Sequence, residues 1–153
     1  MKGSEILQFI KQSWPVQNTF RGVFPSDRLP THLPSGIRHA FICNLDKAHK
    51  RGTHWVAIFI STFGDITYFD SFGRPPYVKG ILDFIRQHGR RLEYNKVPIQ
   101  GALTRTCGLY CIYFVEQMCI GSSLKRFLHE FQTLNPAFND NRIVQLFLHR
   151  RPS

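Results

Sequence analysis

The chain has 153 residues, of which 42% are hydrophobic and 14% aromatic, and it contains neither an internal repeat nor a low-complexity block. This composition excludes a disordered chain and predicts a single domain over residues 1–153, with a core that needs no metal or disulfide. The longest apolar runs are too short to cross a bilayer, so we expect no membrane partner. Twenty Lys and Arg against ten Asp and Glu give a formal charge of +10, which favours an anionic partner such as nucleic acid.

The basic residues gather in short groups along the sequence. Two of these groups are candidates for nucleic-acid binding: Lys47, Lys50 and Arg51, and Arg86, Arg90 and Arg91. The alternative is a solvated basic surface with no specific partner, and charge alone does not separate the two.

The four cysteines, Cys43, Cys107, Cys111 and Cys119, form no Cys-x-x-Cys pair, and no His or Cys has the spacing of a zinc finger. We therefore expect a reducing, intracellular setting and no metal site. Cys43 falls in a predicted strand, and Cys111 lies one helical turn after Cys107. Cys43 and Cys111 are both expected in the core. The alternative for Cys111 is a redox partnership with Cys107.

The first half of the chain predicts one helix and then three strands. Ser4 is expected to cap a helix whose apolar stripe reaches Trp14, and the proline-rich stretch 15–37 is expected to be irregular. Residues 38–46 and 53–62 are rich in β-branched and aromatic types and predict two strands. The Phe63-Gly64-Asp65 turn then predicts a hairpin, with residues 66–70 returning as its second strand.

The second half is mainly helical. Apolar spacing predicts helices over residues 77–88, 107–119, 123–132 and 139–150, with a strand in 92–99 between the first two. Helices before, between and after consecutive strands predict an α+β fold.

Cys107 is the candidate nucleophile. It begins a predicted helix, where unpaired N–H groups and the helix dipole favour a thiolate, and Gly108 allows a substrate backbone to come close. The alternative is that Cys107 is a small buried hydrophobe, as most free cysteines are.

His54 and Asp70 are the candidate base and its orienting carboxylate. They flank the predicted hairpin, so both are expected at its open end, within hydrogen-bond reach of each other. Gln100, in a glycine-containing loop seven residues before Cys107, could donate its amide N–H to an oxyanion. The alternatives to these catalytic roles are that His54 is an ordinary loop histidine, that Asp70 is a turn residue, and that Gln100 is an exposed loop glutamine.

Five stretches together resemble one protein family. They are Asn18–Phe24, Gly52–Trp55, Tyr68–Gly73, the single residue Gln100, and Thr106–Cys111. In this order they are similar to the adenains, the adenovirus proteases, which belong to the same clan as the SUMO-specific proteases. The resemblance covers roughly residues 6–120.

The resemblance implies an α+β, papain-like cysteine protease fold in which a small mixed sheet packs on a central helix that carries the cysteine. It implies Cys107 as nucleophile, His54 as general base and then acid, Asp70 as orienter and Gln100 as oxyanion donor. Trp55 would line the substrate groove or, as the alternative, pack in the core.

The resemblance also implies a polypeptide substrate: viral or virus-like precursors cleaved at small, glycine-containing sites. No cofactor is required for this chemistry, and DNA is an expected activator. Adenains are activated by a disulfide-linked peptide, but no cysteine lies between Cys43 and Cys107, so any peptide activator would be non-covalent. Asp70 stands where adenains carry Glu and matches the SUMO proteases.

Two other functions are open at this point. One is a deconjugase of ubiquitin-like proteins, and the other is a catalytically silent nucleic-acid-binding domain. For a viral protein we expect location in the host nucleus and the virion.

Overall fold

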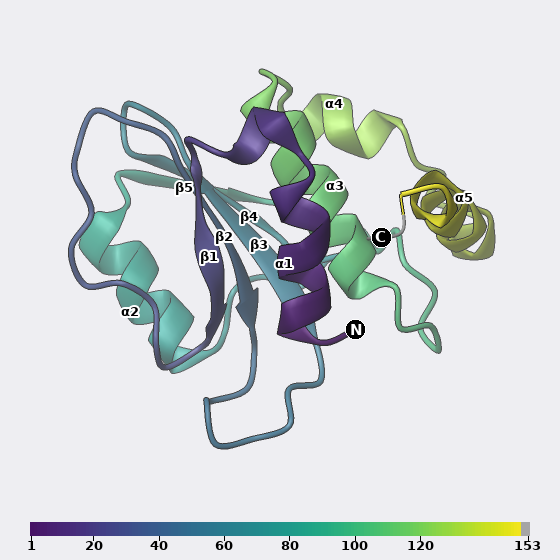
Figure 1. Cartoon of the computed structure of the whole chain (residues 1–153), viewed down its shortest axis with the longest axis horizontal. Helices are drawn as coiled ribbons and strands as arrows, with labels where there is room; N and C mark the ends of the chain where they lie inside the picture. The colour runs from purple at the N-terminus through teal and green to yellow at the C-terminus, as the bar shows by residue number, and fades with distance from the viewer. Residues whose placement is uncertain (151–153) are drawn as a thin grey trace.

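The computed structural model describes residues 1–150 and shows a five-stranded mixed sheet between helices (Figure 1). The strands are β1 (Phe20–Pro25), β2 (His39–Asn44), β3 (Trp55–Ile60), β4 (Asp65–Phe69) and β5 (Arg91–Tyr94). They stand in chain order across the sheet. The pairs β1–β2 and β4–β5 are parallel, whereas β2–β3 and β3–β4 are antiparallel.

Helices cover both faces of the sheet, with α2 on one side and α1 and α3 on the other (Figure 1). The helical elements are α1 (Gly3–Lys11), the short 3-10 helix η1 (Trp14–Val16), α2 (Lys79–His88), α3 (Cys107–Cys119), α4 (Leu124–His129) and α5 (Pro136–Leu148). Helix α3 is central, because it packs on β3 and also contacts α1, α4 and α5. Ten of its thirteen residues are buried, as expected for a helix that is apolar nearly all round.

The sheet separates two hydrophobic clusters. Strand β2 shows why, since its side chains alternate between the faces. Ala40 and Ile42 pack in the cluster with α3, whereas Phe41 and Cys43 pack in the cluster with α2. The expected small mixed sheet packed on a cysteine-bearing helix is therefore confirmed.

The predicted hairpin is also confirmed. Strands β3 and β4 are antiparallel, and Ala57 pairs with Phe69. This register places the residue before β3 and the residue after β4 at the same end of the sheet. His54 and Asp70 occupy these two positions.

Three local predictions are wrong. The strand expected over 92–99 ends at Tyr94. Helix α1 begins at Gly3 and its N-cap residue is Lys2, so Ser4 lies inside the helix, and Trp14 is 79% exposed in η1. The stretch 15–37 is not wholly irregular, because it contains β1. Strand β1 is an edge strand that ends in a proline, which an edge tolerates.

Residues 151–153 of the predicted domain lie outside the described residues. None of the helices within residues 1–150 combines the length and the apolar character that crossing a bilayer requires.

Candidate active site

Cys107 is the first residue of α3, so its side chain lies at the positive end of the central helix. Burial alone raises the pKa of this thiol. The hydrogen bond with His54 and the backbone N–H groups of Trp55 and Gly108 outweigh burial and lower the pKa below its usual value. The site therefore favours a thiolate at Cys107.

The other three cysteines are in a different electrostatic setting. All four are free and buried. Burial raises the pKa of Cys43, of Cys111 and of Cys119. Cys43 and Cys111 lie in the two core clusters, as predicted. Only Cys107 has the lowered pKa that a nucleophile needs.

His54 lies immediately before β3 and is only 6% exposed. Its backbone carbonyl accepts a hydrogen bond from the N–H of Leu45. Its Nε2 lies 2.7 Å from Oδ1 of Asp70. Burial lowers the pKa of His54, but the hydrogen bonds to Asp70 and Cys107 dominate and raise it to about 9. An imidazolium at His54 next to a thiolate at Cys107 is therefore the favoured state near neutral pH.

Asp70 follows β4 and is completely buried. Its Oδ1 also accepts the backbone N–H of Phe72 at 2.9 Å, and its Oδ2 lies 3.3 Å from Nε of Arg74. The side chain of Asn95 bonds to both the backbone N–H and the carbonyl of Asp70. The carboxylate is thus held from several sides in the orientation that His54 requires.

The turn after Asp70 holds the imidazole from a second direction. The ring of Phe72 stacks on that of His54, with centroids 4.6 Å apart. The guanidinium of Arg74 lies over the ring of Phe72, 5.3 Å from its centroid. Gly73 makes the turn feasible because its φ is +70°, and a Cβ there would lie 2.5 Å from the backbone of Val97.

Gln100 is buried beside Cys107 and lines the same groove. Its Oε1 accepts a hydrogen bond from Oγ of Ser71 at 2.5 Å, and its Nε2 donates to the carbonyl of Thr104 at 2.9 Å. The Thr104 carbonyl, which can only accept, identifies which side of the amide carries the donors. Nε2 carries two N–H groups and also lies 3.2 Å from Oγ1 of Thr104, so an oxyanion at Cys107 would take the place of that hydroxyl while the bond to the carbonyl stays.

A carboxylate from the far end of the chain holds this loop. Asp140, in α5, accepts hydrogen bonds from the N–H of Gly101, the hydroxyl of Thr106 and the hydroxyl of Tyr110. These three groups flank Gln100 and Cys107 in the sequence. Asp140 thereby joins the loop of Gln100 to the start of α3.

We expect Asp140→Asn to destabilise the protein by about 1–3 kcal/mol, because Oδ1 accepts the two hydroxyls and Oδ2 accepts the Gly101 N–H, and the amide NH₂ that replaces one of these oxygens cannot accept. Turnover of a peptide substrate should fall as the loop shifts. Urea unfolding and kcat/KM measurements test this. The control is Asp83→Asn, since Asp83 forms an exposed pair with Lys79 and exposed pairs contribute little; equal effects of the two substitutions would contradict the role of Asp140.

The four predicted catalytic residues converge on one groove of about 1120 Å³. His54, Gln100 and Cys107 line it, and Asp70 lies behind His54. Trp55 also lines the groove, and its indole N–H donates to the carbonyl of Met1. Gly108 faces the same residue, since a Cβ on it would lie 2.7 Å from Sδ of Met1. A substrate that uses Gly108 would compete with Met1 for this space.

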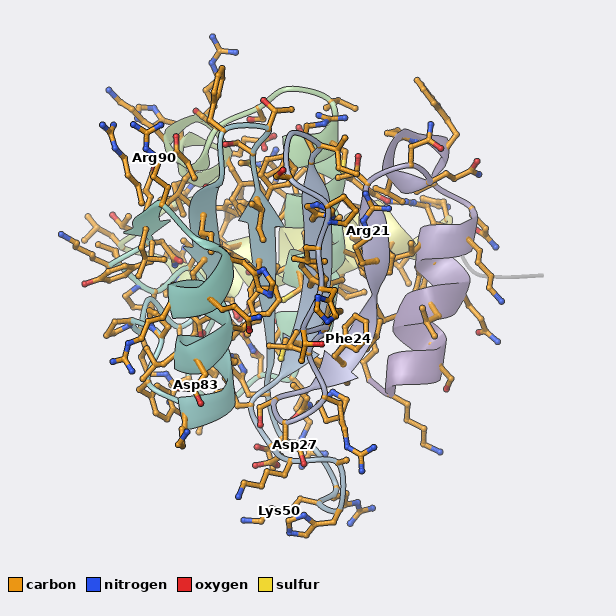
Figure 2. All side chains as sticks on the ribbon, turned by 90° about the vertical axis from the view of Figure 1, so that its left-hand side faces the viewer. Arg21, Phe24, Asp27, Lys50, Asp83 and Arg90 are labelled. Atoms are coloured by element: carbon orange, nitrogen blue, oxygen red, sulfur yellow. The ribbon has the colours of Figure 1, made fainter. Side chains whose placement is uncertain are left out.

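The six candidate nucleic-acid residues separate into two places. Figure 2 shows Lys50 in a loop at one end of the molecule and Arg90 at the other. The first group, Lys47, Lys50 and Arg51, lines the groove of Cys107. The second group is not part of that lining; it consists of Arg86, Arg90 and Arg91.

Sequence reasoning missed the residues that hold the site, namely Phe72, Asn95 and Asp140. Phe72 could have been found from the turn between Asp70 and Gly73. Asn95 and Asp140 carry no local signal, because each acts on a residue at least 25 positions away. Within residues 1–150, no group of three or more His, Cys, Asp or Glu side chains could hold a metal ion.

Comparison with known proteins is consistent with this geometry. No protein-family model matches the chain. Over 121 residues it is 29% identical to "Putative thiol protease R355" of Acanthamoeba polyphaga mimivirus. The match includes 70% of this chain but spans only 40% of the length of that relative.

Solved structures with the same arrangement extend over more of the chain. The ASFV pS273R protease superimposes with a TM-score of 0.63 at 15% identity, over 93% of this chain and 65% of that one. The central domain of the uncharacterized Lpg1148 protein from Legionella pneumophila gives a TM-score of 0.51 at 11% identity, over 98% of both chains. At these identities the likeness is one of fold. The α+β fold expected from the sequence, a small mixed sheet packed on the central helix that carries the cysteine, is the fold that this chain adopts and shares with the ASFV pS273R protease.

Proposed function

We propose that this protein is a cysteine-type endopeptidase with Cys107 as nucleophile, His54 as base and acid, and Asp70 as the orienting carboxylate. The observation that carries the proposal is that the buried His54 lies 2.7 Å from Asp70 and lines the same groove as Cys107, the one cysteine with a lowered pKa. The fold shared with the ASFV pS273R protease and the match to a thiol protease support it.

The proposed mechanism is acyl transfer. The Cys107 thiolate attacks a peptide carbonyl, and Gln100 with a backbone N–H at Cys107 stabilises the oxyanion. The His54 imidazolium gives its proton to the leaving amine. The neutral imidazole then takes a proton from water, which attacks the thioester and releases the acid product with Cys107 restored. In this mechanism the oxyanion replaces the Thr104 hydroxyl at the second N–H of Gln100.

We further propose viral or virus-like precursor polypeptides, cleaved at small, glycine-containing sites, as the substrates. The similarity of the motifs around His54 and Cys107 to the adenains and the mimivirus relative support this. A viral connection is supported in the same way, whereas location in the nucleus or the virion stays a prediction. The low pKa of Cys107 argues against a catalytically silent domain.

Stimulation by DNA also stays a prediction, based on the formal charge of +10. If DNA is an activator, added duplex DNA should raise the rate of peptide hydrolysis, and this increase should disappear as the salt concentration rises. A diglycine-tailed ubiquitin-like protein offered in the same assay separates an endopeptidase from a deconjugase.

Alkylation with iodoacetamide at pH 6 tests the central proposal. We expect modification at Cys107 alone, as located by mass spectrometry, because the other thiols are protonated at this pH. Hydrolysis of a glycine-containing peptide should fall in proportion to the modified fraction. The control is Cys119→Ser, which should label at the wild-type rate. Full activity in completely alkylated protein would contradict the proposal.

A further inference from the structure

One part of the groove is formed by the loop before β3, here called the basic loop, residues 47–51. Four of its five residues line the same groove as Cys107, and three of these four are basic: Lys47, Lys50 and Arg51. Two further basic residues, Lys2 and Arg105, line other parts of it. The walls of the groove are therefore strongly positive.

These charges have few acidic neighbours. Asp46 is the one acidic residue of the groove lining, and it accepts a hydrogen bond from the hydroxyl of Thr53. Asp27 lies beside the loop, where it accepts the N–H of Ala48 and so anchors the backbone (Figure 2). The ion pairs found within residues 1–150 include none of the five basic residues that line the groove. Their charges are left for a ligand.

A second observation at the base of this loop also indicates a ligand. Asn44 is only 4% exposed and lines the groove. Its Oδ1 accepts the N–H of Asp46 at 2.9 Å, but its Nδ2 has no partner among the described residues. A buried amide donor without an acceptor is costly. Nδ2 lies against Gly52, next to the basic loop, so an acceptor oxygen of a ligand reaches it only when this part of the loop shifts.

We propose that the polypeptide substrate carries Asp or Glu side chains which bind the basic loop while the cleaved bond lies at Cys107. This inference rests on the proposed peptidase function and names the chemistry of the substrate. Carboxylates match both the free cations of the loop and the unpaired donor of Asn44.

Chain geometry limits where these acidic residues lie. Arg51 and Lys47 precede His54 by three and seven residues, so their Cα atoms are at most about 11 Å and about 25 Å from it. An extended substrate advances about 3.3 Å per residue. The acidic side chains should therefore lie within about seven residues of the cleaved bond, on one side of it.

Fluorogenic peptides with one glycine-containing centre and with Glu, Gln or Lys at those positions, on either side, test the proposal. Each exposed ion pair contributes a factor of up to about five. We therefore expect kcat/KM to be about tenfold higher for the Glu peptide than for the Gln peptide, mainly through KM, and the difference to shrink with salt. The triple variant Lys47→Glu, Lys50→Glu and Arg51→Glu should instead prefer the Lys peptide.

A control with the same charge change is Lys11→Glu, Lys125→Glu and Arg126→Glu, since these exposed residues lie outside the groove lining. It should keep the preference for Glu. Equal hydrolysis of the Glu and Gln peptides by the wild type would overturn the inference and leave the peptidase intact. So would a loop variant that loses affinity for a short DNA duplex but keeps the Glu preference, because the loop would then bind nucleic acid.

Binding measured without turnover separates the two proposals. In Cys107→Ala, fluorescence anisotropy should show tighter binding of the Glu peptide. The same binding preference, with no hydrolysis of any peptide by the wild type, would support the acidic ligand and refute the peptidase.

Discussion

Cys107→Ala is expected to lower kcat/KM for peptide hydrolysis by about four orders of magnitude or more. The reason is that the reaction proceeds through a bond to this sulfur, and the remaining groups act only on that intermediate. The fold should persist, because alanine fits the first turn of α3 and the loss is one small side chain at 7% exposure. Peptide turnover and thermal unfolding, measured on the same preparation, test both parts.

Cys111→Ala is the matched control. Cys111 lies one turn further along α3 in the core cluster, and burial raises its pKa. Its loss should reduce stability through a small cavity but leave turnover within a few-fold. Hydrolysis that survives in Cys107→Ala at more than a few per cent would refute the nucleophile assignment.

Asp70→Asn is expected to lower kcat by up to about 10⁴-fold, the size of the loss that the same change causes in a Ser-His-Asp triad. The direction in which this substitution shifts the pH profile follows from the two opposing influences on the pKa of His54. Burial lowers the pKa of His54, and Asp70 is the main group that raises it to about 9. Without the carboxylate, the imidazolium loses its proton at a lower pH. The basic limb of the kcat/KM profile, expected near pH 9 in the wild type, should therefore move down.

The acidic limb of the kcat/KM profile should move to higher pH in Asp70→Asn. The hydrogen bond with His54 is the largest influence that lowers the pKa of Cys107. A weaker imidazolium lets that pKa rise, so the pH range that holds the thiolate–imidazolium pair narrows from both sides.

The control is Asp65→Asn, the same substitution at the other end of β4. A kcat/KM profile from pH 5 to 10 should be unchanged in this variant. An unchanged basic limb in Asp70→Asn would mean that the carboxylate does not set the protonation of His54.

The chemistry of the site was accessible from the sequence because its signals are local. His54 and Asp70 are 16 residues apart and flank one hairpin, so the turn at Phe63–Asp65 alone places them at one end of two strands. Cys107 begins an apolar segment, and helix periodicity indicated the start of α3 correctly.

The residues that hold the catalytic side chains in place act through contacts between distant parts of the chain. The periodicity of the sequence contains no information on such contacts. Strand β1 escaped prediction because its six residues include Gly22 and Pro25, which are rare in strands, and it forms by pairing with the distant strand β2. Asn95 and Asp140 act on residues 25 and 39 positions away.

By itself, the sequence determined the α+β class, the hairpin that brings His54 to Asp70, and the identity of the helix that carries Cys107. Each follows from side-chain patterns within about twenty residues. Only the tertiary structure decided that α5 holds the loop of Gln100 through Asp140, and that the basic loop lies in the groove rather than with Arg90. These depend on how whole elements pack, and packing is set by the summed burial of many side chains, not by any one segment.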